Sequence, residues 1–153
     1  MRIAIGSDHA GFEWKEKVKE ILVEMGVEVK DFGTQSKESV DYSDFGLKVA
    51  HGVADGEYDY GVNICGTGNG MAMASNKVHG IRAGLAVNPE MAYMTRLHNN
   101  ANILVLSQRY TPEADLKEIV QLFLNTKFEG GRHIPRIEKF MAEEEKEGGS
   151  IEK

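Results

Sequence analysis

Residues 60–70 read YGVNICGTGNG, a short apolar segment that runs directly into a cysteine and a glycine-rich loop. Residues 60–64 have the length and composition of a buried strand. Good helix-forming residues follow at 71–77. Strand, polar loop and helix in this order form one unit of a parallel α/β sheet, so further units are expected on both sides of it.

The rest of the chain repeats this alternation. Further strands are expected at residues 2–7, 27–32, 81–87 and 103–106. Helices with apolar residues at helical spacing are expected around residues 14–25, 45–53 and 89–98. Gly26 and Gly56 stand where the first two of these helices end, as cap glycines do.

The last strand is followed by a long helix, with Thr111 as its expected N-cap and Pro112 as its first residue. Its expected buried face consists of Leu116, Ile119, Val120, Phe123 and Leu124. The segment FEGGRH then breaks the pattern before a further helix at residues 134–147. Residues 148–153 are expected to form a disordered tail.

Five strands that alternate with helices predict a parallel sheet with helices on both faces, a Rossmann-like three-layer α/β/α sandwich of doubly wound type. The length of 153 residues and the hydrophobic content of 41% suit a single domain, which we place at residues 1–147. In such sheets ligands bind at the carboxyl ends of the strands, near the switch in winding direction. The polar strand exits are therefore the expected place for a site.

Composition argues against several classes of partner. The formal net charge of −6 argues against broad binding to nucleic acid or to anionic lipid. No run of about eighteen apolar residues is present, and the start of the chain lacks the features of a secretory signal, so a cytoplasmic protein is expected. A single cysteine forms neither an internal disulfide nor a structural zinc site, so it serves either packing or chemistry.

The loop GTGNG, residues 66–70, has three glycines ahead of a helix, which lets backbone N–H groups turn inward as a cradle for an anion or an oxyanion. A plain strand-to-helix turn is the alternative. The loop lacks the Lys that a Walker A motif requires, and Met71 breaks the dinucleotide fingerprint GxGxxG. The next strand ends without an acidic ribose clamp, so no NAD cofactor is expected.

Cys65 directly precedes this loop. The N–H groups and the helix dipole that favour an oxyanion also favour a thiolate, so the sequence predicts a lowered pKa for the Cys65 thiol and a reactive role. The alternative is a small buried hydrophobic residue, as many lone cysteines are.

Two other segments place polar residues near the end of a strand or a helix. Asp8 and His9 follow the first strand, where they suit hydroxyl and phosphate recognition, although Asp8 also suits a helix cap and His9 a surface loop. His98 lies on the inner stripe of its helix, four residues after Met94, so both a core role and a site role are open. The neighbouring amide of Asn99 favours a site.

A compact basic group follows the glycine break. Arg132, His133 and Arg136 bring two guanidinium groups and an imidazole to the start of one helix. This spacing suits a phosphate group, with a solvated basic face as the alternative. Arg109, after the fifth strand, is a further candidate for the same phosphate.

Six segments of the chain read GSDHAGF, DYSDF, CGTGNGMAMASNK, GIRAGLA, HNNANILVL and GGRHIPRI. In order and spacing they resemble the ribose-5-phosphate isomerase B family, which also contains the galactose-6-phosphate isomerase subunits. The likeness covers about residues 1–140. It implies a Rossmann-like sandwich that acts on a small sugar phosphate as a homodimer, or as two dimers paired into a tetramer. Each active site would be built from both subunits, with no metal or other cofactor.

The resemblance also implies roles for individual residues. Cys65 would be the base that moves the proton between C1 and C2 of the sugar, with help from Thr67, and His98 would help to open the furanose ring. The backbone of the loop would hold the enediolate oxygen through Gly66, Gly68, Asn69 and Gly70. Contacts with substrate hydroxyl groups would come from Asp8, Tyr42 and Asn99. Contacts at or near the phosphate would come from His9, Arg109, Arg132, His133 and Arg136.

One branch of the family has a glutamate base at the position of Met71, and methionine cannot accept a proton, so the cysteine version applies. Pro135 and the segment SQRYTPE around Arg109 are less typical of the family. The expected reaction interconverts ribose 5-phosphate and ribulose 5-phosphate through an enediolate. The alternatives are an isomerase of a six-carbon sugar phosphate, allose 6-phosphate or galactose 6-phosphate, and a non-enzymatic phosphate-binding module.

Overall fold

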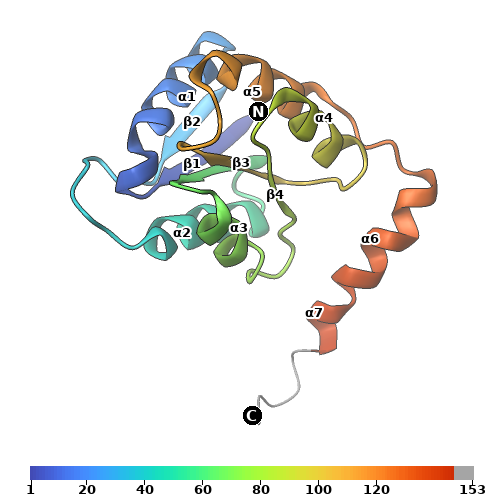
Figure 1. The fold of residues 1–153 in the computed structure, drawn as a ribbon. Helices are drawn as coiled ribbons and strands as arrows, with labels where there is room; N and C mark the ends of the chain where they lie inside the picture. The colour runs from blue at the N-terminus through green and yellow to red at the C-terminus, as the bar shows by residue number, and fades with distance from the viewer. Residues whose placement is uncertain (147–153) are drawn as a thin grey trace.

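The computed structural model describes residues 1–146, in which five strands alternate with helices (Figure 1). The strands are β1 (Arg2–Ser7), β2 (Glu28–Asp31), β3 (Tyr60–Cys65), β4 (Ala83–Leu85) and β5 (Ile103–Ser107). The α-helices are α1 (Phe12–Glu24), α2 (Tyr42–Ala54), α3 (Asn69–Ser75), α4 (Pro89–Leu97), α5 (Leu116–Asn125), α6 (Ile134–Met141) and α7 (Glu143–Lys146). The short 3₁₀ helices are η1 (His9–Gly11), η2 (Glu113–Asp115) and η3 (Gly131–His133). None of the helices within residues 1–146 is long and apolar enough to cross a membrane.

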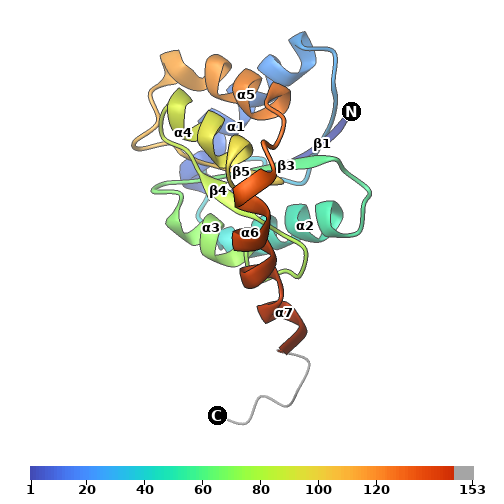
Figure 2. The ribbon, with the colours of Figure 1, turned by 90° about the vertical axis from the view of Figure 1, so that its right-hand side faces the viewer.

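The strands pair in parallel, in the order β2-β1-β3-β5-β4. The chain moves outward from β1 to β2 and then returns across β1 to β3, so β1 and β3 form the switch point of the winding. Right-handed crossovers then place α1 and α4 on one face of the sheet and α2 and α3 on the other. Figures 1 and 2 show these two layers, with α5 beside α4. The predicted doubly wound α/β/α sandwich is confirmed.

Successive residues of each strand point into two different apolar layers. Ile5 belongs to the layer beneath α1, α4 and α5, and Ala4 to the layer beneath α2 and α3. In β3, Ile64 belongs to the first of these layers and Cys65 to the second. The register of the central strand therefore aims the Cys65 side chain toward α2 and α3.

The structure corrects the expected start of the fifth helix. Thr111 is not its N-cap, because the Thr111 hydroxyl accepts a hydrogen bond from the Ser107 N–H at 3.3 Å within the loop after β5. Pro112 has an extended ψ of 139° and precedes η2, so α5 begins only at Leu116. The apolar face expected for this helix is confirmed, since Leu116, Ile119, Val120, Phe123 and Leu124 are all buried.

Two other expected boundaries differ from the structure. The strand expected at residues 81–87 is limited to Ala83–Leu85, because β4 is an edge strand that pairs only with β5. The helix expected at 134–147 is divided at Ala142 into α6 and α7. Residue 147 and the expected tail at 148–153 lie outside the described residues.

Helix α6 lies outside the sandwich, as Figure 1 shows. Its sequence is amphipathic, with Ile134, Ile137 and Met141 at helical spacing, yet none of its side chains is buried. Beyond α6 the chain is held near β4, where the Gly80 N–H donates to the two carboxylate oxygens of Glu144 in α7 at 3.0 and 3.1 Å. A short amphipathic helix gains most of its stability by burying its apolar stripe, and within residues 1–146 this stripe has little to pack against.

Candidate active site

The loops that follow the three central strands meet at the switch point of the sheet. Asp8 follows β1, and its N–H donates to the Ile64 carbonyl of β3 at 3.3 Å. From the loop after β5, the Arg109 N–H donates to the Gly66 carbonyl at 3.0 Å. These backbone bonds hold three strand exits around Cys65, at the position where a doubly wound sheet binds its ligand.

The glycine-rich loop turns its backbone toward the Cys65 thiol. Gly68 has a φ of 85°, and a Cβ at this position would lie 2.4 Å from Leu85 Cδ1, so only glycine fits at this point of the loop without rearrangement. The turn brings the N–H groups of Gly68, Gly70 and Met71 close enough to the thiol sulfur to lower its pKa. The expected inward turn of these amides is therefore present, and the sulfur is the group that they contact.

The pKa of Cys65 differs from the prediction. The side chain is 4% exposed and lies in the layer beneath α2 and α3. Burial raises the pKa of the Cys65 thiol above its ordinary value, and the Asp8 carboxylate raises it further. The three amide contacts lower the pKa but do not outweigh burial. The predicted lowering is wrong for this chain, because the loop amides can be read from the sequence and the burial of the sulfur cannot.

Asp8 caps η1, as one of its two interpretations predicted. Its Oδ1 accepts a hydrogen bond from the Gly11 N–H at 3.0 Å. Burial raises the pKa of Asp8, and the hydrogen bond from Gly11 and the charge of His9 only partly oppose this rise. Asp8 and Cys65 are therefore neighbouring acidic groups, each of which ionises less readily than it would in water.

Tyr42 and His9 lie near the Cys65 loop, close to the start of α2. The Tyr42 ring covers Gly70 so closely that an added Cβ would lie 2.6 Å from Tyr42 Cζ. His9 Nδ1 accepts a hydrogen bond from the Val40 N–H at 3.1 Å and so holds the loop that leads into α2. The structure thus gathers one group of predicted residues around this place: Asp8, His9, Tyr42, Cys65, Gly66, Thr67, Gly68, Asn69, Gly70 and Arg109.

A second group of predicted residues lies on the side of the sheet where the strands begin, opposite to their carboxyl ends. Helix α4 follows the carboxyl end of β4 and runs back along the sheet, so its C-cap, His98, lies near the amino end of β5. The His133 ring stacks on the His98 ring, with 4.3 Å between the centroids and 20° between the planes. The predicted residues found on this side are His98, Asn99, Arg132, His133 and Arg136. Helix α4 therefore carries His98 away from the loops around Cys65 within one chain.

Glu129 belongs to this second group and was missed from the sequence. Its Oε2 lies 3.2 Å from Nε2 of His133 and 3.6 Å from Nε2 of His98. The two imidazole side chains are 7% and 27% exposed, respectively. The available signal was spacing, because Glu129 precedes His133 by four residues across the two glycines of FEGGRH.

Arg96 was also missed. Its guanidinium group donates to the carbonyl groups of Ala101 and Thr126 at 2.5 and 3.3 Å, and to Oδ1 of Asn100 at 3.0 Å. The same group lies 5.0 Å from the centroid of the Tyr60 ring. This buried cation ties the turn that carries His98 to the segment after α5. An arginine on the inner stripe of α4 was the signal in the sequence.

The ligand atoms of His98, Glu129 and His133 lie within 4.8 Å of one another, a spacing at which three side chains can share a metal ion. Two histidines and one glutamate suit zinc. The lone pair of each ring nitrogen lies in its ring plane, and these two planes are nearly parallel. Stacked rings do not both aim at one ion at a bond length of about 2.0–2.1 Å unless one ring rotates. The arrangement therefore suits a shared carboxylate better than a metal centre.

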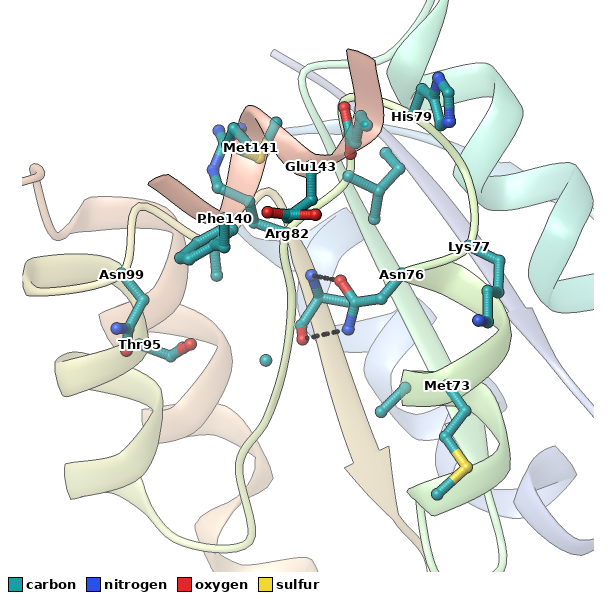
Figure 3. Close-up of a pocket in the computed structure, with 16 residues that line it drawn as sticks. Met73, Asn76, Lys77, His79, Arg82, Thr95, Asn99, Phe140, Met141 and Glu143 are labelled. Carbon is teal, nitrogen blue, oxygen red and sulfur yellow. Dashed lines mark hydrogen bonds between the residues drawn. The ribbon is translucent and has the colours of Figure 1, made fainter. Parts of the chain in front are cut away.

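A cavity of about 730 Å³ lies along the free edge of β4, between α3, α4 and the α6–α7 segment (Figure 3). The Asn76 amide covers part of this edge, because it bonds to the carbonyl and the N–H of Ala83 at 3.0 and 2.8 Å. Asn99 and Phe140 line the cavity from the other side. Cys65 is not among the lining residues, so this cavity is distinct from the group of residues around the thiol.

Comparison with known proteins shows that these motifs belong to one protein family. The profile of the Ribose/Galactose Isomerase family matches residues 3–140. The chain belongs to this family. One family member, ribose-5-phosphate isomerase B of Escherichia coli (strain K12), is 44% identical over 145 residues, which cover 95% of this chain and 97% of that protein.

Solved structures of the family share the fold. Ribose-5-phosphate isomerase B of Clostridium thermocellum has a TM-score of 0.94 and 50% identity, with 96% of this chain and 99% of that chain covered. The Mycoplasma genitalium enzyme, solved with bound ribulose-5-phosphate, has a TM-score of 0.90 and 41% identity, with 94% and 96% covered. The resemblance inferred from the six segments is confirmed.

Proposed function

We propose that this chain interconverts ribose 5-phosphate and ribulose 5-phosphate through an enediolate, with Cys65 as the base. The observation that carries the proposal is the position of the Cys65 thiol at the switch point of the sheet, in contact with three inward-facing loop amides and beside Asp8. The family relatives named ribose-5-phosphate isomerase B support the choice of a five-carbon sugar.

The reaction makes three demands on the protein. The furanose ring must open, a carbon-bound proton must leave from a position next to the carbonyl group, and the negative charge of the enediolate must be stabilised. A positioned base contributes about 10² to 10⁴ in rate, and a single oxyanion donor about 10² to 10³. The Cys65 thiolate would move the proton between C1 and C2, and the amides of Gly68 and Gly70 would donate to the developing oxyanion.

The neighbouring side chains suit the hydroxyl groups of the sugar. Asp8 and Tyr42 lie beside the base and offer acceptor and donor groups to them. The Thr67 hydroxyl accepts a hydrogen bond from the Asn69 N–H at 3.2 Å, which leaves its own hydrogen free to assist proton movement at the enediolate. Because the pKa of the Cys65 thiol is raised, the thiolate is the minor form at neutral pH and turnover should increase with pH.

Each active site is proposed to combine the first group of one subunit with the second group of its partner. The first group lies at the carboxyl ends of the strands and the second near their amino ends, so a single chain does not bring His98 beside Cys65. The unburied apolar face of α6 supplies a surface that a second copy can cover. In a two-fold dimer the same contact occurs twice, so both sites are completed at once. Two such dimers could pair further into a tetramer.

The partner would contribute the groups that bind the phosphate. Arg132 and Arg136 are exposed on η3 and α6, where no carboxylate pairs with them among the contacts of residues 1–146. Guanidinium groups bind phosphate oxygens through paired hydrogen bonds. Phosphate binding would position the sugar with its C1 and C2 at the thiol.

A substrate panel tests the proposal. Purified protein should form ketose from ribose 5-phosphate faster than from allose 6-phosphate or galactose 6-phosphate, and excess EDTA should leave the rate unchanged. A clear preference for a six-carbon substrate would replace the proposed sugar. Failure to exchange the C1 protons of ribulose 5-phosphate with solvent deuterium would refute the isomerase mechanism and favour a phosphate-binding module.

A further inference from the structure

The carboxylate of Glu129 is placed by the backbone on both sides of it. The Glu129 N–H donates to the carbonyl of Leu97, the residue before His98, at 2.9 Å. Gly130 and Gly131 then adopt φ values of 73° and 56°, which turn the chain back so that His133 stacks on His98. The position of Glu129 relative to both rings is therefore set by main-chain contacts as well as by its own side chain.

The shared carboxylate selects which ring nitrogens carry hydrogen. An ionised carboxylate only accepts hydrogen bonds, so Nε2 of His133, at 3.2 Å, donates to Glu129. Nε2 of His98 faces the same oxygen at 3.6 Å and is favoured as N–H by the same negative charge. With hydrogen on Nε2, the neutral His98 ring has its lone pair on Nδ1.

We propose that Glu129 is a positioning residue that keeps His98 in the Nε2–H form, so that Nδ1 is the atom that acts in ring opening. The inference rests on the proposed function. In this step Nδ1 takes the proton of the anomeric hydroxyl, the C1–O1 bond becomes a carbonyl, and the C1–O4 bond breaks with its electron pair going to O4. The proton held on Nδ1 is then returned to O4, so the ring opens with no net change in the histidine.

The test separates ring opening from proton transfer at carbon. Ribose 5-phosphate must be opened before it reacts, whereas ribulose 5-phosphate cannot form a furanose because its O5 carries the phosphate. Exchange of the C1 protons of ribulose 5-phosphate with solvent deuterium therefore needs the base and does not need the ring opener. Glu129→Leu removes the acceptor, Glu129→Gln removes the charge, and Glu129→Asp restores a carboxylate on a shorter arm.

Glu129→Leu should lower kcat/KM for ribose 5-phosphate about 10- to 100-fold, the range typical of residues that orient a working histidine. Deuterium exchange at C1 of ribulose 5-phosphate should stay close to the wild-type rate. Glu129→Asp should recover part of the loss. The matched control is Glu118→Gln on the exposed face of α5, which should change neither rate. Nitrogen-15 NMR of the neutral His98 ring should find its hydrogen on Nε2 in the wild type. In Glu129→Leu it should find a mixture of the Nδ1–H and Nε2–H tautomers.

Three results would overturn the inference: wild-type kcat/KM in both Glu129→Leu and Glu129→Gln, an equal loss of deuterium exchange in these variants, or a wild-type His98 with its hydrogen on Nδ1. If Glu129→Leu fails to fold, the rates of Glu129→Gln and the NMR measurement on the wild type still test whether Glu129 sets the tautomer of His98. A Cys65→Ala variant that retains deuterium exchange would instead refute the proposed base and leave the tautomer of His98 unaffected. The two failures are therefore distinguishable.

Discussion

Mixing two inactive variants should restore activity if the site is shared between subunits. A Cys65→Ala chain keeps the second group intact, and a His98→Asn chain keeps the first. Random exchange of subunits at equal concentrations makes half of the dimers mixed, and each mixed dimer has one intact site of its two, so about a quarter of the wild-type turnover should return. The rate of ribulose 5-phosphate formation, followed over time after mixing, measures this recovery against the sum of the two parents.

The reciprocal mixture provides the control. A chain that carries both Cys65→Ala and His98→Asn, mixed with an equal amount of wild type, places one defect in each site of the mixed dimer. Half of the starting activity should then be lost as subunits exchange. If both residues of a site came from the same chain, the first mixture would gain nothing and the second would lose nothing, and the shared site would be refuted. Native mass spectrometry can confirm in both cases that mixed dimers have formed.

Four other substitutions test the chemistry and the packing. Cys65→Ala should lower turnover and C1 deuterium exchange by at least about 10²-fold while circular dichroism shows an unchanged fold. Asp8→Asn keeps an acceptor for the cap and removes the charge that opposes the thiolate, so the rise of kcat/KM with pH should move to lower pH. Asp31→Asn should lower the free energy of unfolding by about 3 kcal/mol in denaturant titrations, because it leaves the fully buried ammonium of Lys15 without this partner. Burial alone would raise the pKa of Asp31, but hydrogen bonds from two lysines hold it below its ordinary value. The wild type therefore has this stabilisation above the ordinary pKa and loses it as the pH falls through the folded-state value, whereas Asp31→Asn should show no such loss. Phe123→Ala should cost about 3–5 kcal/mol of unfolding free energy, measured in the same way, because its ring, on the inner face of α5, is fully buried.

The sandwich could be predicted because its strands and helices depend on patterns that lie close together in sequence. Gly26, with a φ of 76°, ends α1 as its position indicated. The N-cap expected at Thr111 failed for a reason of the same local kind. A threonine hydroxyl can bond to several nearby backbone groups, and in this loop the Ser107 N–H takes it instead of a helix N–H. Sequence alone does not rank such competing partners.

The part of the candidate site that could be predicted is made of residues that are neighbours in the sequence. Cys65 and the loop that follows it are neighbours in the chain, so the contact between the sulfur and the loop amides could be anticipated. The pKa of the thiol could not, because it depends on how deeply α2 and α3 bury the sulfur. The position of His98 could not be inferred either, since it depends on the direction in which α4 returns along the sheet.

The raised pKa of the Cys65 thiol is consistent with a site that is shared between two subunits. The loop amides alone do not make Cys65 a ready base, because burial and the Asp8 charge oppose ionisation. A cation within about 4–6 Å favours a thiolate. Arg132 and Arg136 of the second group have no carboxylate partner among the contacts of residues 1–146, and in the same chain they lie away from Cys65. In the proposed dimer these guanidinium groups approach the partner's Cys65 loop. Dimer formation would then lower the pKa of the Cys65 thiol and also supply the missing side chains of the site. A chain kept monomeric should therefore have a higher thiol pKa than the dimer.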